Sequence, residues 1–341
     1  MLAQTETALS PEPPTARATG HSFLRELGVQ DWLVGAYLIL LNAAILQGQR
    51  GPTFTGNLIK VNLLAVFFAV GIGLTRSGAL KDGWIKAILY RLALYAPVQL
   101  SYFFFREILP SVNPGSLDVE LHDLDIALFG VEPAVLLDRV VTPTTTEWFS
   151  FFYFGYFVVL AVHVVPILFF SRNHRVLSEF TLGMLLVFCI GHIVYMLVPG
   201  FGPYYAMKDA FATPFPRGVW LDLVMNTVSS GGALKDIFPS LHTAGPLFIA
   251  LFSYRYRARA PYRYTWPLVA FTCLNIIVAT MFLRWHYLID VVAGVLLAAF
   301  VMLIVPGLVE FELERRTRGG LGPLIPPAPR DGDAGGSSEP R

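Results

Sequence analysis

The sequence predicts an all-α protein, a polytopic membrane helix bundle of about eight transmembrane helices. Its composition is the first observation: 55% of the 341 residues are hydrophobic, only 14% are charged, and the mean hydropathy is +0.57. Soluble domains carry about 25% charged residues, so a water-soluble fold of this length would expose too much apolar surface. The second observation is a series of apolar runs about 20 residues long, the length that a helix needs to cross the hydrocarbon core.

Eight apolar segments account for these runs. The sixth is the shortest, and it begins with polar residues at Ser240. In order along the chain, the segments cover residues 31–48, 56–75, 84–109, 147–171, 177–199, 240–256, 264–283 and 286–311. The sequence therefore predicts a multi-pass protein with an even number of spans.

Two long connections separate some of the segments. The stretch from Leu117 to Val140 mixes apolar and acidic residues and is too charged to span, so the connection 110–146 is predicted to contain an interfacial helix pair. The connection 200–239 is rich in Gly, Pro and aromatic residues, and it is predicted to be a structured loop.

The charges of the loops predict the orientation. Lys and Arg residues are more numerous in the termini and in the loops after the second, fourth and sixth segments than in the other loops. By the positive-inside rule, that side is cytoplasmic and carries both termini. Residues 1–28 and 313–341 are polar, Pro-rich tails that are predicted to be disordered. The loop after the fifth segment and the starts of the sixth and eighth then share the non-cytoplasmic (periplasmic or luminal) side.

The start of the eighth segment carries the first candidate for chemistry. His286 and Asp290 are four residues apart, so on a helix they share a face and can form a hydrogen bond. A carboxylate on one imidazole nitrogen sets the tautomer and makes the other nitrogen a better nucleophile or base. An acid one turn inside an apolar helix is costly unless it is paired, which makes Asp290 a candidate functional residue. The alternative is a structural His–Asp pair.

The start of the sixth segment, Pro239-Ser240-Leu241-His242, carries a second histidine. Pro suits the first turn of a helix, and Ser240 can cap free backbone N–H groups. The exposed N–H groups at a helix start also favour an anion such as phosphate. The alternative is that Ser240 is only a cap and His242 only an interfacial histidine.

The loop after the fifth segment and its surroundings supply tyrosines and cations. Lys208, Arg217 and Arg284 lie on the same expected side as the two histidines and are candidate ligands of a phosphate. Tyr204 and Tyr205 lie in the same loop, and the alternative is that they belong to an aromatic belt at the membrane surface. The sequence has no metal-ligand spacing and no nucleotide-binding motif, so no metal and no cofactor are expected, and nothing indicates nucleic acid.

On these residues the chain resembles the type-2 phosphatidic acid phosphatase (PAP2) superfamily, and within it the inositol phosphotransferase branch that includes inositol phosphorylceramide synthases. The resemblance rests on residues 202–205, 239–242 and 279–294, which occur in the same order as the motifs of the superfamily. Two positions favour the transferase branch over the phosphatases. Leu241 stands where the phosphatases have Gly, and Thr280 stands where they have Arg.

The resemblance implies an architecture and a mechanism. Residues 84–312 would form a six-helix catalytic core, with two accessory transmembrane helices in residues 29–83. His286 would attack phosphorus to form a phosphohistidine, Asp290 would orient His286, and His242 would act as general acid and then as base. The phosphoryl oxygens would be held by the remaining candidates, Tyr205, Lys208, Arg217, Ser240 and Arg284.

Three functions are therefore in competition. The first is a lipid phosphotransferase that moves a phospho-headgroup, such as phosphoinositol, from a glycerophospholipid to a lipid hydroxyl, such as that of ceramide. The second is a lipid phosphate phosphatase. The third is a non-enzymatic transporter, which the gathering of polar residues at one face disfavours, since a transport path would cross the bilayer. The expected partners are the membrane and the donor and acceptor lipids, and the sequence makes no prediction of the oligomeric state.

Overall fold

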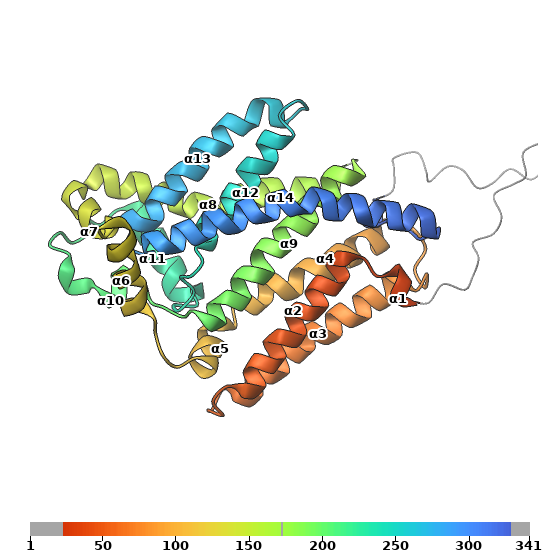
Figure 1. The fold of residues 1–341 in the computed structure, drawn as a ribbon, viewed down its shortest axis with the longest axis horizontal. Coiled ribbons are helices and arrows are strands. Elements are labelled where there is room, and N and C mark those ends of the chain that lie inside the picture. Colours follow the sequence, from red (N-terminus) through yellow and green to blue (C-terminus); the bar gives the residue numbers. More distant parts are fainter. Residues whose placement is uncertain (1–22, 172, 329–341) are drawn as a thin grey trace, which may run out of the picture.

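The computed structural model describes residues 23–171 and 173–328, and in this part of the chain helices form the whole of the regular structure apart from one isolated bridge (Figure 1). The predicted all-α membrane bundle is confirmed. The long helices are α2 (Val29–Gln47), α3 (Phe54–Arg76), α4 (Trp84–Tyr102), α8 (Pro143–Phe170), α9 (His174–Leu197), α12 (Leu241–Arg255), α13 (Tyr262–Phe282) and α14 (Leu288–Gly319). The short helices are α1 (Phe23–Glu26), α5 (Phe105–Val112), α6 (Asp118–Phe129), α7 (Pro133–Leu137), η1 (Asp138–Val140), α10 (Pro203–Ala206), η2 (Lys208–Ala210) and α11 (Val219–Gly231).

Six helices, α2, α3, α8, α9, α13 and α14, are each long and apolar enough to cross a membrane. The predicted third span, 84–109, is instead two helices, α4 and α5, which meet at an angle of 66° and count as a seventh span only if they are taken together. Helix α12, which the sequence predicts as the sixth span, has 15 residues. That is fewer than the roughly 20 that a straight spanning helix needs.

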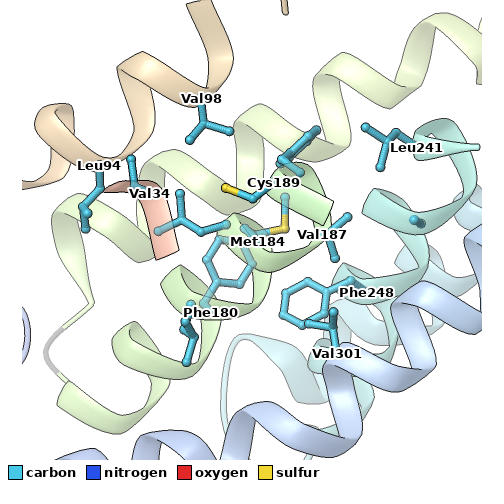
Figure 2. Packing of buried hydrophobic residues seen from close by; sticks show 14 of the residues in the cluster. Val34, Leu94, Val98, Phe180, Met184, Val187, Cys189, Leu241, Phe248 and Val301 are labelled. Carbon is cyan, nitrogen blue, oxygen red and sulfur yellow. The ribbon is translucent and has the colours of Figure 1, made fainter. Parts of the chain in front are cut away.

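Helix α9 forms the centre of the bundle. It packs against α2 and α4 on one side and against α12 and α14 on the other. Figure 2 shows this core, where Phe180 and Met184 of α9 lie among Phe248 of α12, Val301 of α14 and Leu94 of α4. The hydrophobic core thus joins the N-terminal helices to the helices that carry the histidine motifs.

The chain beyond residue 312 is more ordered than the sequence suggests. A disordered tail is expected from residue 313, but α14 continues to Gly319, and Leu324 and Ile325 are buried. Carbonyl oxygens hold this segment, because Leu324 O accepts hydrogen bonds from Arg76 (2.8 Å) and Gln30 (3.0 Å). Composition alone cannot reveal such partners. The predicted disordered N-terminal tail, 1–28, likewise contains a helix, α1 at Phe23–Glu26. The parts 1–22 and 329–341 of the predicted tails lie outside the described residues.

The connection 200–239 contains a helix that the sequence analysis missed. Helix α11 begins where the Glu147 carboxylate of α8 accepts hydrogen bonds from the backbone N–H groups of Trp220 (3.2 Å) and Leu221 (3.1 Å). Its Leu221 and Val224 are buried in the bundle. The helix cap comes from a residue more than 70 positions away, which is why the loop-like composition was misleading. Apolar residues at helical spacing after Gly218 were the available signal.

The two ends of the bundle differ in what they carry. Helices α6, α7 and α10 gather at one end, whereas α1 and the C-terminal end of α14 lie together at the other (Figure 1). Side chains connect the latter pair, since Arg316 of α14 donates hydrogen bonds to the Glu26 and Gly322 carbonyls. Which end faces the cytoplasm stays a prediction from the loop charges.

Candidate active site

Helices α12 and α14 begin side by side, and this brings the two histidine motifs together. The backbone N–H of Ser240 donates to the carbonyl of Asp290 at 3.0 Å. The approach needs glycine at position 294, because a Cβ there would lie 2.6 Å from the Ser240 carbonyl oxygen. As a result, the ring centroids of His242 and His286 are 6.3 Å apart.

Asp290 holds the ring of His286. The Nδ1 atom of His286 lies 3.3 Å from Oδ2 of Asp290, and the same oxygen accepts from the backbone N–H of Tyr287 at 3.0 Å. Both side chains are buried. The predicted contact is present, although not across a shared helix face, because His286 precedes the first helical residue of α14 by two positions. With Nδ1 directed at the carboxylate, Nε2 is the nitrogen left to react.

His242 faces His286 from the first turn of α12. Its ring stacks on Tyr153 of α8, with centroids 4.5 Å apart and planes at 14°, and it also contacts Tyr156 at 4.3 Å. Two aromatic neighbours fix the ring orientation opposite His286. The pair can therefore place one ring on each side of a reacting phosphorus.

A cavity of about 350 Å³ lies between the two histidines and helices α4, α8, α9 and α11. His242, His286 and Tyr205 line it, and Asp290 stands behind His286. Aromatic side chains make up much of the wall. In the part of the chain that the structure describes, no three His, Cys, Asp or Glu side chains are grouped so that they could hold a metal ion.

The structure does not bring the other predicted phosphate ligands to the cavity wall. Lys208 is exposed, and the exposed Arg217 pairs with Asp222 at 3.3 Å. Ser240 is the buried N-cap of α12, where its hydroxyl accepts from the Thr243 N–H at 3.3 Å. Their roles as phosphate ligands stay predictions that no contact to the cavity supports.

Arg284 has a different set of neighbours from those expected of a phosphate ligand. Its guanidinium pairs with Asp138 at 2.7 Å and lies 4.1 Å from the ring centroids of both Phe211 and Phe215. It also donates to the Thr213 carbonyl at 2.6 Å. In this arrangement Arg284 links the loop at residue 213 to η1 and is not directed at the cavity.

Helix α6 supplies two carboxylates that the sequence analysis did not single out. Asp125 accepts hydrogen bonds from the first backbone N–H groups of α14, those of Leu288 and Ile289, each at 2.7 Å. Asp118 accepts from the N–H groups of Phe201 and Gly202, each at 2.8 Å. Helix α6 thus braces both loops around the cavity. The acidic residues spaced along this helix were the signal in the sequence that could have indicated this role.

Gly202 is required by the turn that Asp118 braces. Its φ is +78°, in the region that favours glycine. A Cβ at this position would lie 2.2 Å from the Trp285 carbonyl oxygen, next to His286. The turn is also tied to that loop by the Tyr204 N–H, which donates to the Arg284 carbonyl at 2.6 Å.

A model of the PAP2 superfamily matches residues 119–304. The chain belongs to the PAP2 superfamily. The match includes both histidine motifs, α6 and α11, and it lies within the predicted catalytic core, 84–312. Membership makes this PAP2 protein a lipid enzyme of the phosphatase or phosphotransferase type. No curated protein and no solved structure matches the chain significantly.

We expect Asp125→Ala to destabilise this PAP2 protein and to slow its reaction. The substitution leaves two partly buried N–H groups at the start of α14 without their acceptor, a loss of about 1–3 kcal/mol. The thermal unfolding midpoint in detergent and the turnover rate should both fall. Asp123→Ala is the matched control, since Asp123 lies on the same helix with a side chain that is 74% exposed. Equal effects of the two substitutions would contradict the bracing role.

Proposed function

We propose that this PAP2 protein transfers a phospho-headgroup from a glycerophospholipid to a lipid hydroxyl through a phosphohistidine intermediate. The observation that carries the proposal is the pair of histidine rings, 6.3 Å apart across a largely aromatic cavity, with Asp290 behind one of them. Phosphoinositol is one candidate headgroup and ceramide one candidate acceptor, as the resemblance to the inositol phosphotransferase branch implies.

The reaction has two balanced steps. In the first, Nε2 of His286 attacks phosphorus, the bond from phosphorus to the diacylglycerol oxygen breaks, and His242 donates a proton to that oxygen. In the second, His242 removes the proton of the acceptor hydroxyl, whose oxygen attacks phosphorus and releases His286. Asp290 stabilises the positive charge that develops on the His286 ring in each step.

The charges around the cavity support a phosphodiester donor over a phosphate monoester. A monoester carries a charge of about −1.5 to −2 at pH 7, whereas a diester carries a single negative charge. Cationic side chains are the usual protein ligands of such charge. Among the described residues that line the cavity, none is Lys or Arg. Thr280, at the position where the phosphatases have Arg, is buried in α13, and its hydroxyl donates to the Ile277 carbonyl at 2.7 Å.

A donor and acceptor assay tests the proposal. Purified protein in detergent would receive head-labelled phosphodiester lipids with and without ceramide or diacylglycerol, and labelled phosphatidic acid in a parallel reaction. We expect a new labelled lipid that forms only when the acceptor is present. Release of inorganic phosphate from phosphatidic acid, with no dependence on an acceptor, would instead establish the phosphatase. We place this site on the non-cytoplasmic side, on the basis of the loop charges.

A further inference from the structure

Asp236 is an acid of the cavity wall that the proposed mechanism does not use. It lies next to the motif that carries His242, and a parallel bridge to Gly200 fixes its backbone. Its carboxylate lines the cavity and accepts one hydrogen bond, from the Tyr102 hydroxyl at 2.7 Å. Within residues 23–171 and 173–328, no Lys, Arg or His lies within ion-pair distance of it.

Two basic residues of the loops around the cavity, Lys235 and Arg284, bind other groups. Lys235 is only 5% exposed, and its Nζ donates to the carbonyls of Asn113 (3.2 Å), Pro114 (2.9 Å) and Gly115 (2.6 Å). Arg284 pairs with Asp138. Asp236 is therefore the carboxyl group that faces the cavity. Burial raises its pKa, and a cation placed beside it would favour its charged form.

Aromatic rings share the cavity wall with this carboxylate. The cavity is lined by Tyr153, Tyr156 and Tyr195 together with Tyr102, Phe157 and Trp285. Aromatic faces attract cations, and a ring of them is a common protein site for an ammonium group. Among the described residues, an aromatic wall with one carboxylate and without Lys or Arg is the complement of an organic cation.

Charge and hydrogen bonding distinguish between the possible headgroups. A phosphoinositol headgroup would bring its phosphate charge into this cavity without a cation of its own, and its ring hydroxyls would need many polar partners in a wall rich in aromatic side chains. A zwitterionic headgroup carries its own cation, two carbons from the phosphate. With phosphorus at His286, that cation would lie in the same cavity as Asp236.

We propose that the cavity recognises the ammonium of a zwitterionic phosphodiester headgroup, of the choline or ethanolamine type, with Asp236 as its counter-ion and the surrounding tyrosine rings as its walls. The inference rests on the proposed function and specifies the donor class. It makes Asp236 a specificity residue, because it contacts the headgroup and takes no part in bond making.

The binding of soluble headgroups tests this directly, without any turnover. Purified protein in detergent would be titrated with phosphocholine, phosphoethanolamine, inositol phosphate and inorganic phosphate, with calorimetry or tryptophan fluorescence as the readout. We expect the two ammonium compounds to bind about tenfold more tightly than inositol phosphate. Equal or tighter binding of inositol phosphate would overturn the proposal.

Asp236→Asn should remove the preference. The amide keeps the size of the side chain and a partner for Tyr102, so we expect phosphocholine binding to weaken about tenfold and inorganic phosphate binding to change little. Asp222→Asn, at an exposed acid of α11, is the control. A preference that survives in a folded Asp236→Asn protein would also refute the assignment of Asp236.

If ammonium binding is confirmed but no lipid product forms, the proposed transferase function fails and this inference stands. If headgroup transfer from phosphatidylinositol occurs and the protein shows no preference for ammonium compounds, the transferase stands and this inference fails.

Discussion

We expect His286→Ala to abolish headgroup transfer, with a fall in the rate on the order of 10⁶, because the substitution removes the atom that forms the covalent intermediate. No neighbouring group can replace it: Asp290 is fully buried, and His242 is held between tyrosines at the other side of the cavity. The measurement has two parts. Initial rates of label transfer give the size of the loss, and alkaline quenching of the native protein with labelled donor should trap label on the chain.

His163→Ala is the matched control for this experiment. His163 lies in α8, its Nδ1 contacts the Val159 carbonyl at 2.8 Å, and it does not line the cavity. Its replacement should leave transfer and labelling near the native level. Circular dichroism and thermal unfolding would verify that both variants are folded. Label that stays on a folded His286→Ala protein would contradict the assignment of the nucleophile.

The second large effect is expected for Asp290→Asn, with a fall in kcat on the order of 10³–10⁴. The amide retains the shape of the side chain and can still accept from the Tyr287 N–H. It removes the negative charge that stabilises the ring of His286 as positive charge develops there. Asp290 does not line the cavity, so KM should change little.

Steady-state kinetics on the lipid donor separate these two parameters. Asp123→Asn, an exposed acid of α6, controls for a general effect of charge removal. A kcat within a few-fold of the native value would show that Asp290 only fills space. A parallel rise in KM would place Asp290 in substrate binding instead.

Most of the membrane helices and the contact between His286 and Asp290 could be predicted from the sequence because both depend on local pattern. An apolar run of sufficient length forms a spanning helix wherever it occurs in the chain, and α2, α3, α8, α9, α13 and α14 follow this rule. The contact between His286 and Asp290 also follows from a separation of four residues, although a helix start and not a helix face produces it.

The ligands of the charged side chains could not be predicted in this way. Arg284 has the residue type and the position of a phosphate ligand, yet it pairs with Asp138, which is 146 residues away. Lys235 is likewise bound by carbonyls more than 100 residues away. A long basic side chain takes whichever acceptor the fold brings within reach, and residue type says nothing about that choice.

The sequence by itself determined the membrane class, the approximate spans and the two histidine motifs, since hydrophobic length and short spacings act within one segment. Only the tertiary structure decided that α4 and α5 bend apart, that α11 forms, that α6 braces the starts of the site loops, and that Asp236 is an acid facing the cavity. Each of these depends on side chains and backbone groups from distant parts of the chain, because a buried polar group must find its partner wherever the packing of the helices places one.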